Sequence, residues 1–130
     1  MKNQMDRLKN LDRYALLIFL GALALRLLYL YQIQDSPFLN YPQIDALWHH
    51  LWAKSIASGN ILGDEVFFRA PLYPYFLGLI YSIFGEGPIA PRIIQSILGS
   101  LSCVLIYLIA LRLFNRRTAL MAGIIAAIYS

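Results

Sequence analysis

The chain has 130 residues, which is room for one small domain, and it carries a formal net charge of +4. Hydrophobic residues make up 59% of it and charged residues 14%, against about 25% charged in a typical soluble domain. This composition excludes a disordered chain and disfavours an ordinary soluble domain, because a fold of this size cannot cover so much apolar surface. The single cysteine, Cys103, excludes a disulfide framework and a cysteine-based zinc site. The class that remains is an integral membrane protein.

The first apolar segment is 14–33, and it follows a polar, basic stretch of thirteen residues. At about 1.5 Å per helical residue it is about one hydrocarbon thickness long. A cleaved signal peptide would have a shorter apolar region, and this segment ends in aromatic residues that are typical of a membrane interface. We therefore predict a retained span. Its one charge, Arg26, is either an anchor that snorkels to the interface or a partner inside a helix bundle, and both alternatives stay open.

Three more apolar segments follow, at 71–84, 92–112 and 118–130. The first of these has fourteen residues, fewer than the ~17–25 of a span, so we expect it to lie along the membrane interface. The arginines of the 112–117 turn then share a side with the basic N-terminus, and the positive-inside rule places both in the cytoplasm. The predicted fold is all-α and integral to the membrane, with the N-terminus inside. Its spans are about 14–33, 92–112 and 118–130, and its outer loop is 34–91.

The last of these spans is predicted to be incomplete, because thirteen residues reach only about 20 Å along a helix. We therefore expect residues 1–130 to be the N-terminal fragment of one larger polytopic domain. Small residues recur at intervals of four at Gly99 and Cys103 and again at Ala119 and Gly123. This spacing predicts close packing between the spans.

The outer loop contains a second helical pattern over about 42–58, with Gly59 at its end. Its apolar stripe consists of Ile44, Leu47, Trp48, Leu51, Trp52 and Ile56. We predict a surface helix on the membrane with both tryptophans at headgroup depth. Asp45 and His49 are four residues apart and share one side of it. A carboxylate there can accept a proton from an attacking hydroxyl or bind a cation, and the alternative is a solvated pair that supports the helix.

The surface helix predicted at 71–84 carries Tyr73, Tyr75 and Tyr81 in an otherwise apolar sequence. An interfacial tyrosine suits lipid headgroups and sugars, and a simple aromatic belt is the alternative for each. Arg69 precedes this helix. Its guanidinium can hold a phosphate with two hydrogen bonds, or it can pair with the acidic residues that precede it in the loop.

Taken together, DALWHHLWA at 45–53, Gly59, FRAPLYPYFLGLIYSIFG at 68–85 and the helix that follows resemble a known family. They are similar to the N-terminal part of the C-superfamily membrane glycosyltransferases. The nearest group is the family 39-like enzymes, which are related to protein O-mannosyltransferases and lipid A aminoarabinose transferases. The resemblance covers about residues 25–129.

The resemblance implies a multi-pass enzyme of the cell membrane whose large first outer loop carries two juxtamembrane helices. Such enzymes transfer a sugar from a polyprenyl-phosphate donor to a lipid, glycan or protein acceptor on the outer face. By this resemblance Asp45 is the catalytic base or a contact to a divalent metal or to the acceptor, and Arg69 contacts the lipid phosphate. We further expect His49 and Tyr73 to bind substrate. No other cofactor and no nucleic-acid partner are expected.

Relatives carry a second acidic motif in the next outer loop and many further spans, so we expect the fragment alone to be inactive. A small non-enzymatic scaffold or a transporter piece is the alternative function. A transporter is expected to carry charged or broken helices at mid-membrane, whereas the span at 92–112 is uncharged beyond its terminal arginines. The polar residues gather in the outer loop instead, which favours the transferase.

Overall fold

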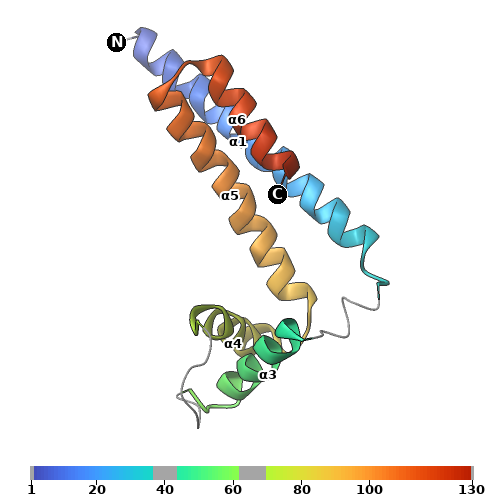
Figure 1. Cartoon of the computed structure of the whole chain (residues 1–130). Coiled ribbons are helices and arrows are strands. Elements are labelled where there is room, and N and C mark those ends of the chain that lie inside the picture. The colour runs from blue at the N-terminus through green and yellow to red at the C-terminus, as the bar shows by residue number, and fades with distance from the viewer. Residues whose placement is uncertain (1, 37–43, 62–69, 130) are drawn as a thin grey trace. The chain divides into compact units, whose positions relative to one another are not determined.

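The computed structural model describes residues 2–36, 44–61 and 70–129, and the regular structure of these residues is entirely helical (Figure 1). The helices are α1 (Lys2–Gln32), α3 (Asp45–Ala57), α4 (Leu72–Phe84), α5 (Ile89–Leu113) and α6 (Arg116–Tyr129). They divide into two compact units. One combines α1, α6 and most of α5, and the other contains α3 and α4. The all-helical fold class is thus confirmed for the described part of the chain.

Two helical segments have the length and the composition of membrane spans, Arg13–Gln32 within α1 and Ile89–Leu113, which is α5. The first agrees with the predicted span to within a residue. The helix itself starts much earlier, at Lys2, because the polar N-terminal sequence is rich in good helix formers. α5 begins three residues before the predicted 92, since Pro91 is tolerated in a first helical turn.

The turn between α5 and α6 is shorter than the predicted 112–117. Arg112 lies in the last turn of α5, and α6 already begins at Arg116. The side chain of Asn115 caps α6 by accepting a hydrogen bond from the backbone N–H of Thr118 at 3.0 Å. Arg116 lies over the ring of Tyr14, 4.1 Å from its centroid, in a cation–π contact. At 14 residues α6 is about 21 Å long, less than the hydrocarbon thickness.

The unit formed by α1, α6 and most of α5, called the spanning unit below, has a core that combines small and large side chains. Its buried members are Ile18, Ala22, Cys103, Tyr107, Ala110 and Ala119. A Cβ on Gly123 would lie 2.8 Å from Cδ1 of Ile18 and 3.2 Å from Cβ of Tyr107, so only glycine allows this approach of α6. The predicted close packing at Cys103, Ala119 and Gly123 is confirmed.

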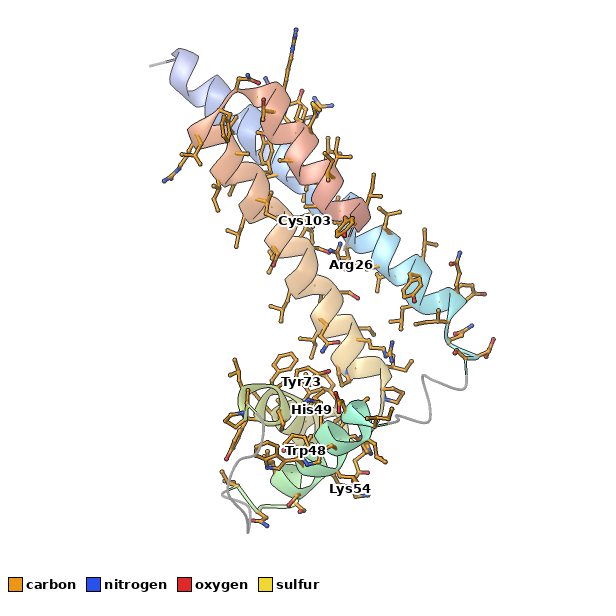
Figure 2. All side chains as sticks on the ribbon, viewed as in Figure 1. Arg26, Trp48, His49, Lys54, Tyr73 and Cys103 are labelled. Carbon is orange, nitrogen blue, oxygen red and sulfur yellow. The ribbon has the colours of Figure 1, made fainter. Side chains whose placement is uncertain are left out.

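Arg26 contacts α5 within the helix bundle, which favours the bundle alternative over the snorkelling anchor. It lies six residues before the end of α1, about 9 Å along the helix. Nη1 donates to the carbonyl oxygen of Ala22 at 3.1 Å, and Nη2 donates to Sγ of Cys103 at 3.5 Å. A Cβ on Gly99 would lie 2.9 Å from Nε of Arg26, which means that the guanidinium occupies the space above this glycine. Figure 2 shows Arg26 pointing toward α5 beside Cys103.

The second unit is a helical hairpin whose bounds follow its prolines and glycines. α4 was predicted at 71–84 and begins one residue later, with Pro71 as its N-cap residue. It ends at Phe84 and is followed by Gly85, which has φ +81°. α3 ends before Gly59, as predicted, and this glycine has φ +103°. α3 begins at Asp45 rather than at 42, after Ile44 with φ 51°, and residues 42 and 43 lie outside the described residues.

The two hairpin helices pack closely through small side chains. Ala53 is fully buried against Leu77 and Tyr81 of α4. A Cβ on Gly78 of α4 would lie 2.7 Å from Cγ2 of Ile56, so the two backbones come close at this point. Ile56 of the apolar stripe of α3 thus contacts α4, whereas Leu51 of the same stripe is 55% exposed. Small residues permit the shortest distance between helices and therefore decide which face packs.

Candidate functional site

The first turn of α3 carries the predicted catalytic carboxylate. Asp45 is the first residue of the helix and its side chain is exposed. At this position the free backbone N–H groups and the helix dipole stabilise a negative charge. The described structure thus presents a solvent-accessible carboxylate at the beginning of the hairpin.

His49 lies one turn after Asp45 and packs among aromatic rings. Its imidazole meets the ring of Tyr73 edge-on, with 5.2 Å between centroids and 89° between planes. The ring of Trp48 lies 5.1 Å from it at 76°. Figure 2 shows Trp48, His49 and Tyr73 gathered between α3 and α4. The fold therefore brings two of the predicted substrate-binding residues into contact, one helical turn from the carboxylate.

The imidazole of His49 has an unsatisfied nitrogen. Nδ1 is buried, and it has no hydrogen-bond partner in the described part of the chain. A buried polar atom without a partner is destabilising by about 1–3 kcal/mol, so such atoms often mark the place of a water molecule or ligand. The nitrogen is a polar point in an otherwise aromatic cluster.

Two further predictions, the phosphate contact of Arg69 and a possible divalent metal, are not tested by the described residues. Arg69 lies outside the described residues, so its proposed phosphate contact stays a prediction. No three histidine, cysteine, aspartate or glutamate side chains gather closely enough to hold a metal ion within residues 2–36, 44–61 and 70–129.

A contact between His50 and Tyr81 was missed at the sequence level. Nδ1 of His50 lies 2.9 Å from Oη of Tyr81, and the ring centroids are 5.5 Å apart. The signal was present, because His50 precedes the buried Ala53 by three residues and thus shares its helix face. Burial raises the pKa of the Tyr81 phenol above 10, and the neighbouring Tyr73 and Glu86 raise it further. Tyr81 consequently stays protonated at neutral pH and can donate to His50.

We expect the hairpin to lose stability in alkali because of Tyr81. A phenol whose pKa is higher in the folded state stabilises the fold below its unfolded pKa of about 10, and this contribution disappears as the pH rises through the folded value. Tyr81→Phe removes the titrating group and the hydrogen bond. It should lower stability at pH 8 by about 0.5–1.5 kcal/mol and flatten the decline above pH 10. Thermal unfolding followed by tryptophan fluorescence tests this, with the exposed Tyr31→Phe as control. An unchanged alkaline decline in Tyr81→Phe would exclude this phenol as its cause.

The comparison with known proteins gives one match. Residues 69–130 match the sequence profile of a family described as dolichyl-phosphate-mannose-protein mannosyltransferase. The matched segment contains Tyr73 and all of α4, α5 and α6, whereas Asp45 and His49 precede it. No curated protein and no solved structure gives a significant match. Two helices are long and apolar enough to cross a membrane, and over residues 69–130 the chain is similar to the dolichyl-phosphate-mannose-protein mannosyltransferase family of membrane glycosyltransferases.

Proposed function

We propose that the protein transfers a sugar from a polyprenyl-phosphate carrier to an acceptor on the outer face of the cell membrane. The family match over residues 69–130 is the observation that carries this proposal, because the family is named for a polyprenyl-phosphate-linked sugar donor. The membrane-spanning helices agree with it, since a donor with an isoprenoid tail is confined to the bilayer.

The proposed reaction is a displacement at the anomeric carbon of the sugar. The acceptor hydroxyl forms the new bond to this carbon, the bond from the carbon to the phosphate oxygen breaks, and polyprenyl phosphate leaves with that electron pair. The carboxylate of Asp45 accepts the proton of the hydroxyl. Arg69 stabilises the negative charge of the leaving phosphate, as the cationic group that such a step requires.

His49 and Tyr73 are proposed to position the sugar beside Asp45. The aromatic cluster that they form with Trp48 offers an apolar surface with polar edges, which suits the two-sided character of a sugar ring. The buried Nδ1 of His49 would be satisfied by a sugar hydroxyl or by a water molecule that the sugar orders. No step is assigned to a metal ion.

The proposed topology places the N-terminus in the cytoplasm and the α3–α4 hairpin outside, with 34–91 as the outer loop. α5 returns to the inside, and α6 leads outward again as the beginning of a third span. The assignment rests on the basic N-terminus and on Arg112, Arg116 and Arg117. We fuse two reporter enzymes after Arg117, one that is active only in the cytoplasm and one that is active only outside the cell. The cytoplasmic reporter is expected to be active and the external one inactive. An external signal would mean that α4 crosses the bilayer and would invert this part of the topology.

The function is tested with membranes from cells that express the protein from its complete gene. We expect these membranes to transfer radiolabelled mannose from mannosyl polyprenyl phosphate to endogenous acceptors, above the level of membranes without the gene. Other polyprenyl-phosphate sugars are tested in parallel, because the hairpin does not identify the sugar. If none of these donors is consumed while the protein is present and folded, the proposed transfer is wrong.

A further inference from the structure

The hairpin has a cavity at the C-terminal ends of its helices, about 660 Å³ in volume, whose lining includes both charged and apolar side chains. Its lining comes from Leu51, Lys54, Ser55, Ala57, Ser58, Tyr81, Ser82, Gly85 and Glu86. The volume lies within the ~300–1,000 Å³ of small-molecule sites. Lys54 is nine residues beyond Asp45, about 13 Å along α3. The cavity is therefore separate from the cluster of Asp45, His49 and Tyr73.

One positive and one negative side chain meet at this cavity. Nζ of Lys54 lies 2.9 Å from Oε2 of Glu86, and the two side chains are 54% and 48% exposed. A half-exposed ion pair adds little to stability, so each partner can exchange the other for a charge on a ligand. Glu86 disfavours a purely anionic ligand and Lys54 a purely cationic one. The pair thus matches a molecule that carries both charges.

The hydroxyls of Ser58 and Ser82 already donate their protons within the protein, so they can only accept hydrogen bonds from a ligand. Oγ of Ser58 donates its proton to the carbonyl oxygen of Ser55 at 2.8 Å, and Oγ of Ser82 donates to that of Gly78 at 2.8 Å. Each oxygen is left with lone pairs only. Together with the Glu86 carboxylate they favour a ligand group with several N–H donors, which is a primary ammonium rather than a quaternary one.

Large apolar side chains are exposed at the same end of the hairpin. Leu51 is part of the lining, and Ile83 and Phe84 in the last turn of α4 are 65% and 64% exposed. Such a surface next to a cavity that contains an ion pair suits acyl chains beside a headgroup. We propose that this cavity binds the headgroup of phosphatidylethanolamine, with its phosphate on Lys54 and its ammonium on Glu86, Ser58 and Ser82. The proposal is independent of the transfer reaction.

The test uses the fluorescence of Trp48 and Trp52, the two tryptophans of the chain, which both lie on α3. Trp52 lies between the lining residues Leu51 and Lys54 in the sequence, and Trp48 precedes it by about one helical turn. The full chain is reconstituted in phosphatidylcholine vesicles that contain a tenth of a lipid with brominated acyl chains, which quench tryptophan fluorescence. We expect brominated phosphatidylethanolamine to quench at least twice as strongly as brominated phosphatidylcholine or phosphatidylglycerol. Equal quenching by the three lipids, or the strongest quenching by phosphatidylglycerol, would overturn the proposal.

Two variants separate binding from folding. Lys54→Glu combined with Glu86→Lys keeps an ion pair but exchanges the positions of its two charges. The bilayer fixes the orientation of the lipid headgroup, so the headgroup cannot turn around to match. The preference for phosphatidylethanolamine should therefore disappear. Ser82→Ala should reduce the preference, whereas Ser102→Ala, which removes a similar hydroxyl bonded to a helix carbonyl in α5, should not. A preference that survives the charge reversal would show that the cavity does not select the headgroup.

A last arm distinguishes a lipid from a soluble compound with the same groups. Soluble O-phosphoethanolamine at millimolar concentration is expected to leave the selective quenching unchanged, because it lacks the acyl chains that Leu51, Ile83 and Phe84 would contact. Loss of the selective quenching under these conditions would assign the cavity to the free compound and contradict the lipid assignment.

Discussion

Replacing Asp45 with asparagine is expected to lower the rate of sugar transfer at least ~100-fold, the lower end of what a general base contributes. Asparagine preserves the size of the side chain, but its amide cannot accept the proton of the acceptor hydroxyl. The substituted position is exposed and at the beginning of α3, so folding and membrane insertion should be unchanged. The measurement is the initial rate of transfer in membranes that contain equal amounts of the two proteins.

Asp35→Asn is the matched control for this change. Asp35 is also an exposed carboxylate, in the turn that follows α1, and its replacement removes the same charge. We expect its transfer rate to stay within twofold of the unchanged protein. Full activity of Asp45→Asn would remove Asp45 from the mechanism and favour a non-enzymatic role for the hairpin. Equal losses in the two variants would indicate a general effect of charge in this region.

Replacing Gly99 with leucine is expected to have the largest effect on stability in the spanning unit. The Cβ alone would lie 2.9 Å from Nε of Arg26, and the rest of the side chain would displace the guanidinium from its contact with Cys103. Overpacking of this kind is destabilising by about 1–3 kcal/mol, and the displaced charge within the membrane adds to it. Thermal unfolding in detergent, followed by circular dichroism, measures the loss.

Gly21→Leu is the control, because a Cβ on this glycine of α1 meets nothing within 4 Å. It should change stability much less than Gly99→Leu. The cause is isolated by adding Arg26→Ala to each glycine variant. If Gly99→Leu destabilises the protein by displacing Arg26, it should lower stability clearly less when Arg26 is already replaced by alanine. The effects of the two changes should then be non-additive. Strict additivity would mean that Gly99 does not act through Arg26.

The sequence alone determined where most helices lie and that two of them are long and apolar enough to span a membrane. The bounds of α4 were predicted to within one residue, because Pro71 and Gly85 act on the backbone of their own neighbourhood. The same holds for the end of α3 at Gly59. The family resemblance was readable for a similar reason, since the block around 69–85 is contiguous in the chain.

Only the tertiary structure decided which side chains meet. The periodicity of α3 identified its large apolar residues, but it did not reveal that Ala53 is buried against Leu77 and Tyr81 of α4. Likewise, the sequence left Arg26 between two environments, and only the structure shows that its guanidinium lies above Gly99, more than seventy residues away. Helix formation depends on neighbours within a few positions, whereas packing depends on the shapes of surfaces that come from distant parts of the chain. A pattern along one helix therefore predicts its existence and its ends, but not the partner that its surface accepts.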